Sequence, residues 1–143
     1  MIIDRGGWRF FVSNAGNLDA NKCGKWLYFF KGTNGKQFAE EMCKKCLDEG
    51  IVVEAKRSDS EVEGVACFYL NCDDLSTHRR IIDFFLENNM IRRTKEGKLY
   101  NISFKLDRQT QDREYGKSYY SDIKLSHFID LNTGKWLLGD TNG

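Results

Sequence analysis

The sequence predicts an α+β protein built around a ferredoxin-like βαββαβ core. Between Lys25 and Asp107, segments with strand and helix patterns follow one another in the order β-α-β-β-α-β, which is the split βαβ order of that fold. Lys25–Phe30 and Val65–Leu70 are apolar at most positions, as strands covered on both faces are, whereas Leu99–Asp107 alternates. Trp8–Val12 is a further aromatic segment. We therefore expect an antiparallel sheet with two helices on one face, extended by an N-terminal strand and a C-terminal β-hairpin.

The first helix is expected at Gly35–Gly50, after a polar loop at Ser13–Gly24 and the strand Lys25–Phe30. Asn34 is a possible N-cap, and Gly50 is a good C-terminal stop. Apolar residues recur at helical spacing, so one face of this helix is expected to be buried. They are Phe38, Ala39, Met42, Cys43, Cys46 and Leu47.

Two strands and a second helix follow. Ile51–Lys56 is short and β-branched, and the polar turn Ser58–Gly64 separates it from the apolar strand Val65–Asn71. Asp73–Met90 shows helical spacing of its apolar residues. Its start can be capped by any of three residues, Asp73, Asp74 and Ser76.

The C-terminal part is expected to be a loop and a hairpin. Arg108–Asp122 is too polar for a core element. Ile123–Leu131 and Lys135–Leu138 flank Asn132–Gly134, and Asn and Gly tolerate the positive φ of a tight turn. We expect one domain over residues 1–143, with a core at about 25–107 and the loop and hairpin at 108–143.

Composition excludes several classes of protein. The chain has 143 residues, of which 41% are hydrophobic, so it can fill one core and is not wholly disordered. Twenty-two Lys and Arg against 21 Asp and Glu leave a net charge of +1, which a uniformly basic nucleic-acid protein does not have. The charge is unevenly spread, with a net of −6 over Glu40–Asp74 and +4 over Leu75–Arg108. Two opposed patches and two ordinary solvated faces both fit this pattern.

Targeting signals are not recognised in the sequence. No stretch reaches the 18 apolar residues of a membrane span, and Met1–Arg5 lacks the basic-then-apolar order of a signal peptide. Five cysteines are an odd number, which argues against a secreted disulfide framework. We expect a cytoplasmic protein that does not bind a membrane.

No catalytic residue, metal or cofactor is predicted. Cys43 and Cys46 form a single C-x-x-C on the apolar helix stripe, where core packing explains them better than zinc or redox chemistry. His78 and His127 are interpreted as structural. Asp73 and its neighbour could hold magnesium with Glu63, but helix capping explains them better. No G-x-S-x-G, P-loop or Rossmann pattern occurs. A hydrolase that uses Asp or His stays the weakest alternative.

Aromatic strands suggest nucleic-acid binding as one alternative. Ferredoxin-like sheets can stack single-stranded bases on aromatics of their two central strands. The candidates here are Trp26, Tyr28 and Tyr69, with Phe30 and Phe68 beside them. The stretch Glu63–Leu70 resembles an RNA-recognition motif at its Gly and Ala positions. It departs from the motif at Glu63, where Lys or Arg is expected, and at Val65, where an aromatic is expected.

Basic and tyrosine-rich segments suggest a partner surface. A basic cluster could neutralise phosphates or meet an acidic protein patch, and a solvated turn remains the plainer interpretation. Its members are Arg79, Arg80, Arg92, Arg93, Lys95 and Lys98. The long loop adds side chains of the kind that dominate binding hot spots. These are Arg113, Tyr115, Tyr119 and Tyr120.

Gly64–Asp74, Asn88–Asp107 and Phe128–Trp136 resemble small phage and prophage proteins of the anti-CRISPR or anti-defence type. The resemblance implies an inhibitor that binds a host protein or nucleoprotein effector, such as a CRISPR nuclease complex, or that sequesters a nucleotide signal in the host cytoplasm. The alternative is a nucleic-acid or signalling-nucleotide binding protein that uses an aromatic sheet face and a basic turn. Ile51–Ala55 carries little protective charge for an edge strand and could pair across a dimer axis, so monomer and homodimer both stay open.

Overall fold

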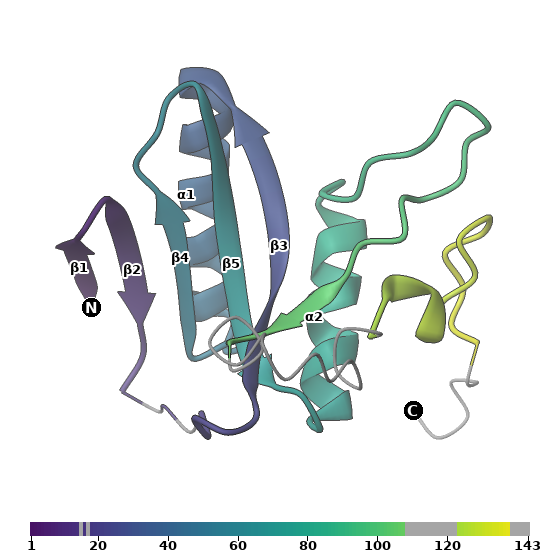
Figure 1. Cartoon of the computed structure of the whole chain (residues 1–143), viewed down its shortest axis with the longest axis horizontal. Helices are drawn as coiled ribbons and strands as arrows, with labels where there is room; N and C mark the ends of the chain where they lie inside the picture. Colours follow the sequence, from purple (N-terminus) through teal and green to yellow (C-terminus); the bar gives the residue numbers. More distant parts are fainter. Residues whose placement is uncertain (15, 17, 108–122, 138–143) are drawn as a thin grey trace, which may run out of the picture.

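The computed structural model describes residues 1–14, 16, 18–107 and 123–137. The described residues form two helices and six strands, followed by a short 3-10 helix (Figure 1). They are β1 (Ile2–Arg5), β2 (Trp8–Val12), β3 (Cys23–Lys31), α1 (Gly32–Asp48), β4 (Glu54–Ser58), β5 (Glu63–Asn71), α2 (Leu75–Glu87), β6 (Phe104–Leu106) and η3 (Leu125–His127).

All six strands form one antiparallel sheet in the order β1-β2-β4-β5-β3-β6. The α+β class predicted from the sequence is confirmed. The two apolar strands β3 and β5 lie inside the sheet and pair along nine residues, from Cys23 opposite Asn71 to Lys31 opposite Glu63. The predicted N-terminal strand also extends the sheet, because β2 pairs with β4.

Both helices pack against the same face of the sheet. Trp26 of β3 contacts His78 of α2, and Tyr28, two residues further on, contacts Phe38 of α1. Side chains on a strand alternate between its faces, so the even-numbered residues of β3 face the helices. Phe68 of β5 lies opposite Trp26 and packs on α2 as well. The core therefore lies between this face and the helices, and Figure 1 shows both helices beside the sheet.

The helix ends correct one prediction and confirm another. Helix α1 begins at Gly32, where φ is +74°, and its N-cap is Lys31 rather than the predicted Asn34. A positive φ explains why glycine stands there. Helix α2 is capped as expected, because the Asp74 carboxylate accepts a hydrogen bond from the Thr77 backbone N–H at 3.1 Å. This contact confirms capping as the role of Asp74.

The prediction for the sheet edge was wrong. Ile51–Ala55 was expected at an edge, but β4 lies between β2 and β5. Strand β1 was not predicted, and it forms a hairpin with β2 through Gly6 and Gly7, both at positive φ. This hairpin covers the edge at which β4 would otherwise end the sheet, so β1 is one outer strand and β6 the other.

The C-terminal elements are shorter than predicted. Only Phe104–Leu106 of the alternating segment Leu99–Asp107 pairs as a strand, because the Leu99 and Tyr100 N–H groups bond to loop carbonyls of Leu131 and Arg92. Within residues 123–137 the expected hairpin is reduced to one bridge between Ile129 and Trp136, and η3 occupies part of its first strand. The turn itself is present: the Gly134 N–H donates to the Asp130 carbonyl at 2.7 Å, and φ at Gly134 is +77°.

Core packing of the cysteines is confirmed. Cys43 and Cys46 are both fully buried free thiols on the inner face of α1. Burial raises the pKa of each thiol. Raised thiol pKa values disfavour the thiolate that redox and metal chemistry require. No helix within the described ranges is both long and apolar enough to cross a membrane.

Candidate functional site

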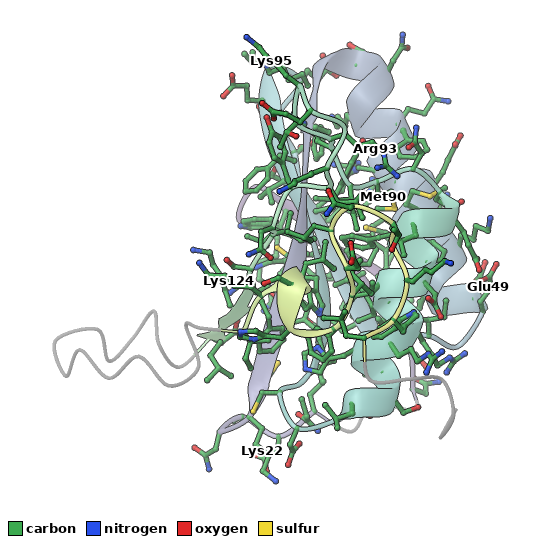
Figure 2. The ribbon with its side chains drawn as sticks, turned by 90° about the vertical axis from the view of Figure 1, so that its right-hand side faces the viewer. Lys22, Glu49, Met90, Arg93, Lys95 and Lys124 are labelled. Carbon is green, nitrogen blue, oxygen red and sulfur yellow. The ribbon has the colours of Figure 1, made fainter. Side chains whose placement is uncertain are left out.

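A pocket of about 640 Å³ lies where two segments distant in the sequence meet. One segment is the end of β3 with the start of α1, and the other is the loop that follows α2. Figure 1 shows this loop extending away from the sheet, and Figure 2 shows Arg93 and Lys95 towards one end of the molecule, with Lys22 at the opposite end. The lining residues are Tyr28, Phe29, Phe30, Lys31, Gly35, Asn89, Met90, Ile91, Arg92, Arg93 and Tyr100.

Three cations and no carboxylate are among the described residues that line this pocket. Lys31, Arg92 and Arg93 are all exposed. Within the described ranges none of the three forms an ion pair, and Arg93 donates one hydrogen bond, to the Gly97 carbonyl at 2.8 Å. Cations that form no ion pair keep their positive potential for an external anion. We call this site the basic pocket.

Aromatic rings stand beside the cations of the basic pocket. Phe29 is 59% exposed and Tyr100 is 46% exposed. Tyr28 is half-buried and meets Phe38 edge-on, with ring centroids 5.8 Å apart. Burial raises the pKa of Tyr28, while the charge of Arg92 acts in the opposite direction. The Tyr28 hydroxyl is therefore protonated at neutral pH. It is also affected by the charge of Arg92.

Local backbone contacts hold the loop side of the basic pocket. Asn89 adopts φ +57°, a left-handed conformation that Asn tolerates better than most residues. The next two residues, Met90 and Ile91, are both 5% exposed and anchor the loop in the core. The Met90 N–H donates to Phe85 at 2.8 Å, and the Tyr100 N–H donates to Arg92 at 2.8 Å. A backbone hydrogen bond thus links Tyr100 to Arg92.

The start of α1 adds to the positive charge at this site. Lys31 precedes the helix, the first turn carries no acidic residue, and no side chain caps it. Gly35, in the first turn, lines the basic pocket. Unpaired N–H groups and the helix dipole give the N-terminus of a helix a partial positive charge, which reinforces the charge of Lys31.

The six predicted basic residues do not form one patch. The Arg79 guanidinium lies 4.7 Å from the Trp136 ring, and Arg80 donates to the carbonyls of Glu49 and Gly50 at 3.4 and 3.1 Å. Arg79 and Arg80 thus hold α2 to its neighbours. Only Arg92 and Arg93 line the basic pocket, while Lys95 and Lys98 are exposed on the same loop outside the lining.

The predicted aromatic stacking platform needs a correction. Trp26 is fully buried, and its indole N–H donates to His78 Nδ1 at 3.0 Å, so its ring is closed to a base. Trp26 and Tyr28 face the helices, whereas Tyr69 faces the opposite side and is only 6% exposed. Phe30 and Phe68 are buried too. Trp26 and Tyr69 therefore do not form an exposed stacking surface, and Tyr28 lines the basic pocket instead.

Part of the helix-free face of the sheet is covered by its own side chains, although Phe29, which alternation places on this face, is 59% exposed. The Lys56 ammonium lies 4.0 Å from the Trp8 ring centroid and 5.3 Å from that of Phe10. It also lies 5.8 Å from the Tyr69 ring, and Lys25 lies 6.0 Å from that ring. These rings and cations contact one another, so this part of the face leaves neither fully available to a ligand.

A second hollow, of about 360 Å³, is lined by α1, Arg57 and Glu61, and most of its charges are paired internally. Arg57 Nη2 donates to Glu40 Oε1 at 2.7 Å, and Lys36 bridges to Asp59 at 2.7 Å. Among the described residues no group of three or more His, Cys, Asp or Glu is placed to hold a metal ion. The predicted loop residues lie outside the described ranges: Arg113, Tyr115, Tyr119 and Tyr120.

Sequence reasoning missed Phe29, Lys31, Asn89 and Tyr100. Lys31 directly precedes Gly32-Thr33-Asn34-Gly35, and this glycine spacing at a strand end was the one available signal. The exposure of Phe29 and Tyr100 had none, because Phe29 lies in an apolar segment and Tyr100 lies on the apolar side of an alternating one, and both patterns predict burial.

No protein-family model matches the chain, and no curated protein matches it. What the basic pocket can do is therefore inferred from its own residues.

Proposed function

We propose that this chain is a binding protein that captures a phosphate-bearing ligand in the basic pocket. The observation that carries the proposal is the lining: Lys31, Arg92 and Arg93 all line this pocket, with no carboxylate among the described lining residues. Arginine presents a planar fork that matches phosphate oxygens, and lysine supplies a point charge. The nearby start of α1 adds a partial positive charge.

Isothermal titration calorimetry with inorganic pyrophosphate tests this proposal. We expect saturable binding that weakens from low to physiological salt, because exposed charges are screened. Arg92→Gln should weaken it about tenfold or more, since one charge-assisted hydrogen bond contributes about 1.5–3 kcal/mol.

Lys105→Gln is the matched control. Lys105 is an exposed cation on β6, which contributes no residue to the basic pocket. An affinity that falls equally in both variants would mean that general charge rather than the pocket binds the anion. Absence of any binding would remove the proposal.

We further propose, from the resemblance to small phage proteins, that this binding serves to inhibit a bacterial immune effector in the host cytoplasm. The exposed loop with Lys95 and Lys98 favours contact with a large partner, because it extends from the sheet (Figure 1). Sequestration of a nucleotide signal would combine both proposals.

A plaque assay checks this: expression of the chain should restore phage growth in bacteria that carry a nucleotide-signalling defence system, and Arg92→Gln should not. Equal plaque numbers with and without the chain would count against inhibition of that system.

We also infer that β3, α1, β4, β5, α2 and β6 form a ferredoxin-like core. Supporting this, the sheet order β4-β5-β3-β6 puts the first and third strands of this unit at its centre. The hairpin β1–β2 would then be an addition at the β4 edge.

A further inference from the structure

We infer that the basic pocket binds a nucleoside phosphate as a single small molecule, with its phosphate at Lys31 and Arg92 and its base against Phe29 or Tyr100. This rests on the proposed capture of a phosphate-bearing ligand and names the class of that ligand.

The first reason is the combination of exposed rings with cations. Phe29 and Tyr100 are among the most exposed large apolar side chains of the described residues, and both line the basic pocket. An inorganic anion makes no stacking contact with these rings, whereas every nucleobase has an aromatic face that can stack on them. The lining thus matches both halves of a nucleotide.

The second reason is the size of the pocket and its surroundings. About 640 Å³ lies within the usual range for small-molecule sites, roughly 300–1,000 Å³. A nucleic-acid strand needs a track of cations and rings along its path. The adjoining sheet face does not provide one, because Lys56 occupies the Trp8 ring and Tyr69 is only 6% exposed.

The third reason is Asn89, an exposed residue of the pocket lining whose amide has no hydrogen-bond partner among the described residues. An amide offers one acceptor and two donors, and it can pair with the polar edge of a base. The positive φ of this position accounts for either Asn or Gly, so the backbone alone does not require the Asn amide. Asn89→Gly therefore separates the amide from the conformation.

The test compares AMP and GMP with ribose 5-phosphate by isothermal titration calorimetry. Ribose 5-phosphate has the same sugar and phosphate without the base. We expect at least one of the two nucleotides to bind about tenfold more tightly than ribose 5-phosphate, the increment that one stacked base supplies. Phe29→Ser or Tyr100→Ala should reduce that ratio and leave ribose 5-phosphate binding unchanged. Arg92→Gln should weaken all three ligands, and Asn89→Gly should change the AMP-to-GMP ratio.

The outcomes distinguish this inference from the proposed function. Equal affinities for nucleotides and ribose 5-phosphate would overturn the inference and leave phosphate capture standing, provided that pyrophosphate binds. A thymidine oligonucleotide that binds more than about tenfold tighter than both nucleotides and displaces them would show a strand site instead. Melting temperatures of the variants close to that of the wild type would confirm that each one folds. If Tyr100→Ala melts early, Phe29→Ser decides the question.

Discussion

At the scale of single residues, a buried hydrogen-bond chain fixes the protonation state of His78. The Trp26 N–H donates to Nδ1 at 3.0 Å, and Nε2 lies 2.9 Å from the Cys72 carbonyl. An indole N–H can only donate and a carbonyl can only accept, so His78 is neutral with its proton on Nε2. Burial lowers its pKa, and the Cys72 carbonyl with the charges of Asp74 and Asp73 only partly opposes this.

This arrangement predicts a loss of stability in mild acid. The folded pKa lies below the unfolded value of 6.5, so the unfolded chain takes up a proton first as the pH falls. The free energy of unfolding should therefore be full above about pH 6.5 and fall by about 1 kcal/mol towards about pH 5.5. Urea unfolding at the two pH values measures this. His78→Gln keeps an acceptor and a donor without titrating, so its stability should change less; an equal change would assign the effect to another group.

Gly24 is a second residue with a specific role, since it allows β6 to approach β3. A Cβ at this position would meet the Phe104 ring and lie 2.6 Å from the Lys105 carbonyl oxygen. Gly24→Ala should lower the free energy of unfolding by about 1–3 kcal/mol, because backbone cannot yield as a flexible side chain can. Gly16→Ala is the control in the same urea experiment, as its Cβ would be 3.8 Å from the nearest atom. Similar losses in both variants would contradict this account of Gly24.

Residue-scale prediction from sequence succeeded for burial and failed for the direction of aromatic side chains. Cys43 and Cys46 were expected in the core from helical spacing, and both are buried. Trp26 and Tyr69 were candidates for one base-stacking face, but they point to opposite sides of the sheet. In a strand with apolar residues at nearly every position, the period of two carries no information about which face is covered.

At the scale of elements, one carboxylate holds α1 to two strands. Glu40 accepts from Arg57 of β4 at 2.7 Å and from Arg9 of β2 at 3.3 Å. Burial raises the pKa of Glu40. The hydrogen bond and charge of Arg57, together with the charges of Arg9 and Lys44, lower it by more, so the pKa lies below its ordinary value. Arg57 is only 5% exposed, so its charge depends on this partner.

Glu40→Gln should therefore lower the free energy of unfolding by about 2–4 kcal/mol, because it leaves the buried Arg57 charge with only the exposed Asp59 carboxylate, at 3.4 Å. Glu41→Gln changes the same chemical group one residue further on, where it is exposed, and should stay within about 0.5 kcal/mol of the wild type. Chemical denaturation of both variants checks the pair. A small loss for Glu40→Gln would show that water or Asp59 compensates Arg57.

Element prediction was most successful where periodicity was strong. Trp8–Val12 and the two helices were found with small errors at their ends. Strand β1 was missed because Ile2–Arg5 is too short to show a period. The C-terminal hairpin was overestimated because Asn132–Gly134 predicts the turn but not the length of the strands beside it.

At the scale of the whole molecule, stability should decrease from the centre of the sheet outwards. Strands β3 and β5 pair along nine residues and carry the buried core, whereas β1 is a four-residue outer strand paired with β2 alone. Hydrogen exchange should be slowest in β3 and β5 and fastest, among the strands, in β1, because edge strands open locally at low cost. Protection of β1 equal to that of β3 would indicate that a second chain covers this edge.

The site was only partly accessible to sequence reasoning. Arg92 and Arg93 were selected as binding residues, because four basic residues follow α2 within a short stretch. Lys31 and Phe29 were not selected, since their proximity to that loop exists only after about 60 intervening residues have folded around β5 and α2. Long-range juxtaposition of this kind leaves no local pattern.

Because two segments that are distant in the sequence form the basic pocket, the pocket exists only in the folded chain. By mass action, a molecule that binds only the native state raises the melting temperature, and at a hundred times its dissociation constant it adds about 2.7 kcal/mol to the free energy of unfolding. Phe29–Gly35 and Asn89–Tyr100 come together only in that state. Heating the protein with a library of phosphorylated metabolites would therefore reveal its ligand as the compound that delays unfolding, without any assay of function.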